Sequence, residues 1–90
     1  MSKIQDIALE VATLVERKNA DYDKSFEKTV AKYGPVAYCL RIDDKLSRFH
    51  ALAVKGNCQK VEDEKITDTV KDIIGYSLLL LDLLENTNDK

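Results

Sequence analysis

The sequence has few residues that break helices, cross-link the chain or bind metals through sulfur and imidazole. It contains three glycines, one proline, two cysteines, one histidine and no tryptophan. So little glycine and proline is typical of an ordered helical protein, not of a linker or a disordered tail. Cys39 and Cys58 have no CxxC partner or histidine pair, which excludes a structural zinc site on ligand count. His50 has no serine or cysteine motif near it, so Ser-His or Cys-His catalysis has little support.

An excess of charge of one sign and a long apolar run are also missing. The net charge is −2 with both signs interspersed, so no basic stripe is available for a nucleic-acid backbone and we expect no duplex binding. The longest apolar run falls far short of the roughly 20 residues that span a bilayer. The N-terminal residues include acids and no apolar signal core. We therefore expect a cytoplasmic protein that does not enter a membrane.

The first part of the chain predicts one long helix and one short helix. Ser2 and Gln5 form a capping box, and apolar residues then recur at helical spacing until about Lys18. Asn and Asp residues interrupt this pattern, since they favour caps and turns. Asp23 is the expected N-cap of the short helix that follows.

The rest of the chain predicts two more long helices. Gly34 and Pro35 mark a boundary, because glycine suits the position after a helix and proline suits the first turn of the next. One helix is expected over residues 35–55 and the last over residues 64–85. The expected apolar side of the first of these is Tyr38, Cys39, Ile42, Leu46, Phe49 and Ala53. No segment alternates with the period of a strand.

These elements predict an all-α fold in a single domain of residues 1–90. Three long helices and one short helix with short connections form a compact antiparallel bundle. The C-terminal part of the last helix is apolar over more than half its circumference, which is more than one neighbour covers in so small a domain. We therefore expect a homodimer or a larger assembly.

Four aspartates in the last two long helices form an acidic constellation. Asp43 and Asp44 are adjacent, and Asp68 and Asp72 lie one helical turn apart. Asp68 and Asp72 share an arc of roughly 80° with three apolar or aromatic residues, Tyr76, Leu79 and Leu83. That arc should be buried against the neighbouring helix, where the four carboxylates can face one another.

Clustered carboxylates need positive charge among them if they are to lose water. A hard divalent cation held by oxygen ligands is one possible partner. Arg41, Lys45 and Arg48, on the helix that carries Asp43 and Asp44, are the competing partners. The pattern alone leaves both interpretations open.

Three pieces of the chain also resemble a known family. They read "ERKNADYDKSF", "YGPVAYCLRIDDKLSR" and "ITDTVKDIIGYSLLL". They resemble the phage and bacterial family called nucleotide modification associated domain 1, with its pattern KNxDYxxSF, RxxDKxxR and DTxxDxxxY, over residues 16–81. That family is similar to the MazG-like all-α nucleoside triphosphate pyrophosphohydrolases, whose metal motif is EExxE followed by ExxD. The resemblance implies a MazG-like fold, and the host cytoplasm as location if a phage encodes the chain.

Carried onto this sequence, the MazG-like motif is incomplete. Asp43 and Asp44 match its paired acids and Asp72 its last aspartate, whereas Ser47 and Thr69 stand where acids belong. Asp68 precedes Thr69 but points about 100° away from it. The resemblance therefore supports a nucleotide pocket better than it supports turnover.

The resemblance implies a metal-assisted reaction. Mg²⁺ or Mn²⁺ on Asp44, Asp68 and Asp72, with Asp43 as a further ligand, would polarise a phosphoryl group and activate water to release pyrophosphate. The implied nucleotide-binding residues are Lys18, Lys45 and Arg48 for phosphate charge, Tyr22 or Tyr76 to stack on or bond the base, Asn19 and Asp21 for the base edge, and Arg41.

Two other functions stay open. The missing acids and the nearby Lys and Arg residues favour a non-catalytic phage-type sponge that sequesters nucleotide-derived signalling molecules. The leucine-rich last helix, taken alone, is consistent with a structural interaction module.

Overall fold

The secondary structure is α-helical throughout the residues that the computed structural model describes, which are 2–55 and 64–88. Within them lie four α-helices, one π-helical turn and no strand. The all-α prediction is confirmed. The elements are α1 (Lys3–Asp21), α2 (Ser25–Tyr33), α3 (Val36–His50), the π-helical turn η1 (Ala51–Lys55), which continues α3, and α4 (Glu64–Asn88).

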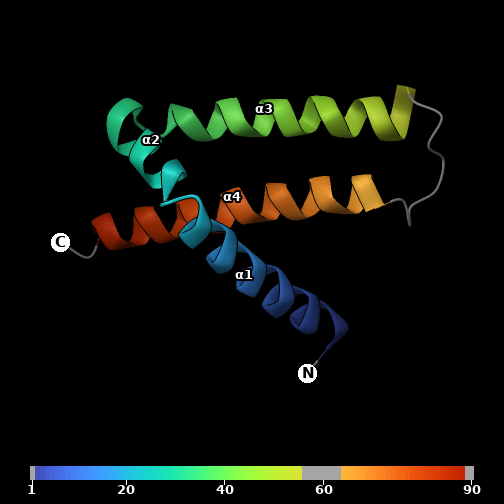
Figure 1. The fold of residues 1–90 in the computed structure, drawn as a ribbon, viewed down its shortest axis with the longest axis horizontal. Coiled ribbons are helices and arrows are strands. Elements are labelled where there is room, and N and C mark those ends of the chain that lie inside the picture. Colours follow the sequence, from blue (N-terminus) through green and yellow to red (C-terminus); the bar gives the residue numbers. More distant parts are fainter. Residues whose placement is uncertain (1, 56–63, 89–90) are drawn as a thin grey trace.

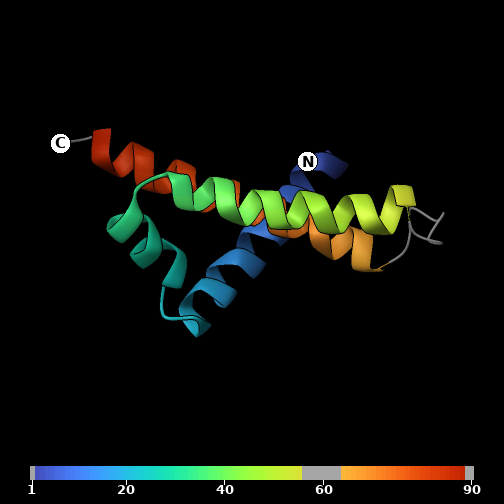
Figure 2. The ribbon, with the colours of Figure 1, turned by 90° about the horizontal axis from the view of Figure 1, so that it is seen from above.

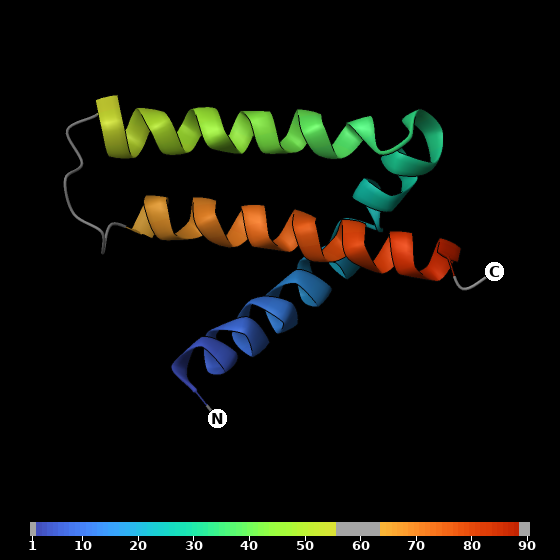
Figure 3. The same cartoon turned by 180° about the vertical axis from the view of Figure 1, so that it is seen from behind.

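Helix α4 lies at the centre of the arrangement. Helices α3 and α4 run antiparallel and side by side, as the two views from opposite sides show (Figures 1 and 3). Helix α1 packs on α4 at an oblique angle, with its N-terminal turns projecting beyond it (Figures 1 and 2). The short α2 contacts both α3 and α4. Three segments distant in sequence therefore meet around the middle of α4.

Both ends of α1 are closed by local hydrogen bonds. The capping box is confirmed: Gln5 N–H donates to Ser2 Oγ at 3.2 Å, and Ser2 N–H donates to Gln5 Oε1 at 2.9 Å. The helix continues past the predicted end at Lys18 and stops at Asp21. There the N–H of Lys24 reaches the carbonyl of Asn19 at 2.9 Å, which is the long-range bond of a Schellman motif.

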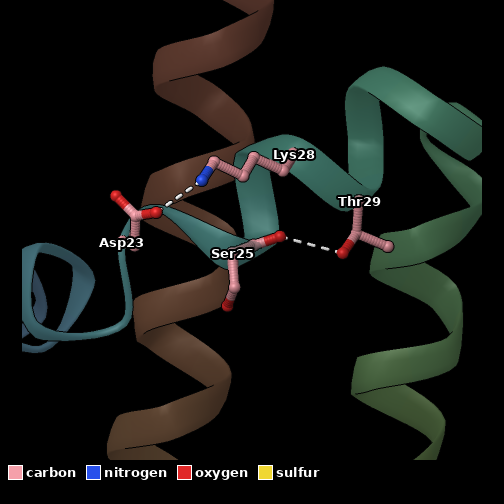
Figure 4. Close-up of polar contacts among 4 residues, drawn as sticks. All are labelled: Asp23, Ser25, Lys28 and Thr29. Carbon is pink, nitrogen blue, oxygen red and sulfur yellow. Dashed lines mark hydrogen bonds and ion pairs between the residues drawn. The ribbon is translucent and has the colours of Figure 1, made fainter.

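The turn between α1 and α2 differs from the expected N-cap at Asp23. Asp23 and Lys24 both have φ 55°, and Lys24 caps α2 without a side-chain hydrogen bond. Asp23 instead accepts a hydrogen bond from Lys28 Nζ at 2.6 Å, and Thr29 Oγ1 donates to the Ser25 carbonyl at 2.8 Å (Figure 4). The prediction was wrong because the Schellman motif that closes α1 includes Asp23 and Lys24, and α2 begins only at Ser25, so that Lys24 stands at its N-cap.

The boundary before α3 is confirmed. Gly34 has φ 87° and Pro35 is the N-cap. Helix α3 is rotated relative to its predicted apolar side, since Ala37 is buried whereas Cys39 and Leu46 are exposed. The prediction that Cys39 is a small core residue was therefore wrong.

A pair of hydroxyl groups joins α3 to α4. Ser77 Oγ donates to the Ile73 carbonyl at 2.8 Å and lies 2.8 Å from the Tyr38 hydroxyl. Because a serine hydroxyl has one hydrogen, Tyr38 must donate to Ser77. This contact fixes the rotation of α3 against α4.

The core is small, as expected for 90 residues. Its buried side chains among the described residues are Val11, Phe26, Ala37, Ile66 and Thr69, drawn from all four α-helices. None of the described helices is long and apolar enough to cross a membrane. Helix α4 extends beyond the predicted end near residue 85, and the predicted loop at residues 56–63, with Cys58, lies outside the described residues.

Candidate functional site

A pocket of about 220 Å³ opens where α1, α2, α3 and α4 meet. Its lining combines apolar side chains with amines, an amide, hydroxyls and a carboxylate. The lining residues are Leu14, Val15, Lys18, Asn19, Tyr22, Ser25, Phe26, Lys45, Lys71, Asp72, Gly75, Tyr76 and Leu79. A largely apolar lining with a few convergent polar groups is typical of a small-molecule site.

Asp72 lies between two lysines from different helices. Its Oδ2 is 3.2 Å from Lys45 Nζ on α3, and its Oδ1 is 3.7 Å from Lys18 Nζ on α1. The Asp72 and Lys45 side chains are 32% and 28% exposed, so water reaches the pairs and each contributes about 0–1 kcal/mol to stability. The sequence left open whether a divalent cation or a basic side chain compensates the acidic residues. At Asp72 a basic side chain is present, Lys45 on α3.

A third lysine adds to the positive charge of the pocket. Lys71 lies in its lining and its Nζ is also 3.4 Å from Glu10 Oε1 on α1. Three lysines thus face the pocket with one aspartate. The local field favours an anionic ligand although the whole chain carries a net charge of −2.

The two pocket tyrosines differ in how free their rings are. Tyr76 packs against Phe26 with ring centroids 5.2 Å apart, and the Arg41 guanidinium lies 5.8 Å from its centroid. Tyr22 lies at the end of α1 and is 65% exposed. The ring of Tyr22 is therefore the better stacking platform, and Tyr76 is held as part of the wall.

Asn19 has a partner that the sequence patterns did not indicate. Its Nδ2 donates to Glu27 Oε2 on α2 at 2.6 Å. Neither Glu27 nor Lys71 belonged to the predicted site. Lys71 had a weak signal, because it lies next to Asp72 on a helix that was expected to face a site, whereas nothing in the spacing of Asn19 and Glu27 indicated a contact.

The structure brings together about half of the predicted site residues. Those that line the pocket are Lys18, Asn19, Tyr22, Lys45, Asp72 and Tyr76, and Arg41 touches Tyr76 from α3. Those outside the lining and exposed are Asp21, Asp43, Asp44, Arg48 and Asp68. Asp68 is exposed at one edge of the expected arc and its neighbour Thr69 is 2% exposed, whereas Asp72, Tyr76 and Leu79 of that arc line the pocket.

The carboxylates do not gather as a metal site needs. Across residues 2–55 and 64–88, no three His, Cys, Asp or Glu side chains are grouped so that they could hold a metal ion. Asp72 is the acidic residue among the described lining residues, and both of its oxygens face ammonium groups. This donor set does not fit Mg²⁺ or Mn²⁺, which take several oxygen ligands. The metal-binding role of Asp43, Asp44, Asp68 and Asp72 stays a prediction.

Fold and site together define an all-α domain with a lysine-lined pocket between its helices. The chain belongs to the family described as nucleotide modification associated domain 1, whose model matches residues 18–83. The matched region contains every pocket-lining residue except Leu14 and Val15. Comparisons with curated proteins and with solved structures found no match.

Proposed function

We propose that the chain binds nucleotides or nucleotide-derived signalling molecules in the pocket between its helices. The observation that carries the proposal is the placement of Lys18 and Lys45 on either side of the Asp72 carboxylate. Two ammonium groups that both approach one anionic side chain, at 3.7 and 3.2 Å, can likewise donate charge-assisted hydrogen bonds to the oxygens of a phosphate. The family description, which associates the domain with nucleotide modification, is consistent with such a ligand.

Within this proposal, the phosphates and the base of the nucleotide occupy different parts of the pocket. A volume of about 220 Å³ is below the range of roughly 300–1,000 Å³ usual for drug-sized ligands, so the pocket holds part of a nucleotide. The phosphates lie near the lysines, where Lys71 supplies further positive charge. The base lies against Tyr22, whose exposed ring offers a stacking surface.

Capture without hydrolysis is the form of this function that the geometry favours. A MazG-like pyrophosphohydrolase holds divalent cations with a set of acids, whereas Asp72 is the acidic residue in the described lining of this pocket and is already paired with Lys18 and Lys45. Lysines at that position attract phosphate and repel a cation. A non-catalytic sponge needs cationic and aromatic groups and no metal cluster. Such a role suits a cytoplasmic protein, in the host cell if a phage encodes it.

The testing experiment is a thermal-shift screen of nucleotides, cyclic dinucleotides and ADP-ribose derivatives, with Mg²⁺ and with EDTA. Capture predicts that at least one compound raises the melting temperature in EDTA and is recovered unaltered after heat release. A pyrophosphohydrolase predicts that the stabilisation requires Mg²⁺ or Mn²⁺ and that pyrophosphate appears. If no nucleotide shifts the melting temperature in either condition, the proposal fails and the interaction-module alternative gains support.

We also propose that the chain assembles with a second copy of itself. Helix α4 carries an exposed apolar stripe within about 120° of its circumference, formed by Val70, Ile74, Leu78, Leu81 and Leu84. The first turns of α1 carry two further exposed apolar residues, Ile4 and Ile7, which are 79% and 45% exposed. A stripe that runs about 21 Å along one helix is self-complementary across a two-fold axis, because the same stripe then meets itself.

A further inference from the structure

The hydrogen bond between Asn19 and Glu27 determines which end of the Asn19 amide faces Glu27. The two side chains approach at 2.6 Å, from the last turn of α1 and the first turn of α2. An ionised carboxylate accepts hydrogen bonds and donates none, so the amide nitrogen must be the atom that faces it. The amide oxygen of Asn19 then points away from Glu27, and Asn19 lies in the pocket lining.

Among the residues that the structure describes, Asn19 is the hydrogen-bond donor to Glu27. Its other oxygen, Oε1, is buried and accepts no hydrogen bond from any residue that the structure describes. If the amide of Asn19 turned over, two oxygens would face each other and Glu27 would lose its hydrogen bond in a half-buried position. Leaving a carboxylate unpaired in this way is strongly unfavourable, so the orientation of Asn19 is fixed before any ligand enters.

We propose that Glu27 is a positioning residue that makes Asn19 Oδ1 a fixed acceptor, so that the pocket selects nucleotides that present a hydrogen-bond donor to it. This inference rests on the proposed function. The donor is either an exocyclic amine, as on adenine or cytosine, or a hydroxyl of the sugar. Each of these groups can donate a hydrogen bond to Asn19 Oδ1, and the titrations described below distinguish the amine from the hydroxyl.

A carbonyl in place of the amine is disfavoured for a direct reason. Its lone pairs would face the Asn19 oxygen, and Asn19 cannot rotate its nitrogen towards them without breaking the bond to Glu27. A site that hydrogen-bonds one group discriminates against an analogue that cannot complete the bond. Because Asn19 is half-buried, not fully buried, we expect a ratio of about tenfold.

The test is a set of calorimetric titrations of the full chain in EDTA with ATP, ITP, CTP, UTP and 2′-deoxy-ATP. If the donor is the amine, ATP binds about tenfold more tightly than ITP, and CTP more tightly than UTP. If it is the sugar hydroxyl, ATP and ITP bind alike and 2′-deoxy-ATP binds about tenfold more weakly. Equal affinity for all five, or tighter binding of ITP, overturns the inference while the proposed function stands. If none of the five binds, the proposed function itself fails for these ligands and the inference falls with it.

A variant of Glu27 isolates the positioning role. In Glu27→Gln the new amide can accept from Asn19 or donate to it, so the orientation of Asn19 is no longer fixed. The ratio of the affinities for the preferred and the disfavoured nucleotide should fall towards one. The affinity for the disfavoured nucleotide should stay within about twofold, because the lysines are unchanged. Glu16→Gln, an exposed position on the same end of α1, is the control with the same charge change and should keep the full ratio.

If Glu27→Gln melts at a markedly lower temperature, Asn19→Ala gives the same readout. It removes the acceptor and should bring the ratio to one with the Glu27 carboxylate in place. A full wild-type ratio in folded Asn19→Ala contradicts the assignment of the acceptor to Asn19.

Discussion

Asp72 is the residue on which the two leading functions differ most. If the chain binds nucleotides without hydrolysing them, the Asp72 carboxylate competes with a phosphate for the ammonium groups of Lys18 and Lys45. As a catalytic carboxylate, it would be required for turnover. The same substitution therefore has opposite consequences under the two functions.

Replacing Asp72 with Asn should tighten the binding of ATP by several-fold in EDTA. The reason is that one negative charge is removed from between two lysines while the shape of the side chain is kept. The fold should lose no more than about 2 kcal/mol, since both ion pairs are partly exposed and each contributes about 0–1 kcal/mol. Titration calorimetry measures the affinity, and Asp82→Asn, an exposed position on the same helix, is the matched control. A large loss of affinity in Asp72→Asn would mean that Asp72 itself contacts the ligand.

Asp23 has a pH dependence of known sign. The hydrogen bond and the positive charge of Lys28 hold the pKa of Asp23 below its ordinary value of 3.8. A carboxyl whose pKa is lowered by folding contributes stability above its unfolded pKa and loses it as the pH falls through the lower folded value. In Lys28→Met, an NMR titration should show the Asp23 pKa returning towards 3.8. An unchanged pKa in that variant would contradict the role of Lys28 drawn in Figure 4.

Some of the residues that lie in the pocket were predictable from the sequence because they belong to a motif. The positions of other residues were not predictable, because they depend on how a helix is rotated about its axis. Lys18, Lys45 and Asp72 were each singled out and do converge. Asp43 and Asp44 follow the same family motif, but they point into water because α3 turns Lys45 towards α4. The helical repeat of about 3.6 residues determines which residues share a face of a helix. Which face then turns towards a neighbouring helix is determined by tertiary packing.

At the scale of elements, the shape of the pocket depends on how closely α1 approaches α4. A Cβ added to Gly75 would lie 2.8 Å from Cγ2 of Val15. Val15 is β-branched and has little freedom to move aside. Glycine at this point of α4 is therefore explained by close packing, since its helix is otherwise regular.

Replacing Gly75 with Ala should destabilise the fold by about 1 kcal/mol. Alanine gains roughly 1 kcal/mol of helix propensity over glycine, but overpacking of this kind costs about 1–3 kcal/mol and α1 must shift outward. Urea unfolding measures the change. Ser77 is unsuitable as a control because it joins α4 to Tyr38 on α3. Asn86→Ala, whose hydrogen bond to Asp82 is exposed and lies within α4, serves instead and should change stability by less than about 0.5 kcal/mol. A more stable Gly75→Ala would show that Val15 yields easily.

Element boundaries were predictable to different degrees. The capping box at Ser2 and the break at Gly34 and Pro35 are local chemistry, and both are confirmed. The end of α1 was placed too early because the Schellman closure at Asn19 and Lys24 uses backbone groups, which carry little sequence signature without a glycine. The rotation of α3 depends on the contact between Tyr38 and Ser77, which are far apart in sequence.

At the scale of the whole molecule, the exposed stripe of α4 predicts self-association. Replacing Leu81 with Gln should shift the chain towards monomer, because Leu81 is 53% exposed at the middle of the stripe and is removed from water only by a second copy. Sedimentation velocity over a range of concentrations measures the state. Leu40→Gln, 61% exposed on α3 and outside the stripe, is the matched control and should leave assembly unchanged. A wild-type chain that is monomeric at all concentrations would refute the proposed dimer.

The all-α class and the membership of the family were both foreseen from the sequence. The pocket itself and the contact between Asn19 and Glu27 could not be predicted from the sequence, since both depend on the angle at which α1 and α2 meet α4. The angle at which two helices cross depends on how the side chains of both surfaces interdigitate, so the sequence of one helix does not determine it.

The central claim is that Lys18 and Lys45 hold the phosphates of a nucleotide. Its most direct test is the affinity of ATP, in EDTA, for the wild-type chain, for the double variant Lys18→Gln/Lys45→Gln and for the control Lys32→Gln, which changes an exposed lysine on α2. We predict that the double variant binds at least about tenfold more weakly, because charge-assisted hydrogen bonds are lost, while the control stays within about twofold. A folded double variant that binds ATP as tightly as the wild type would contradict the claim.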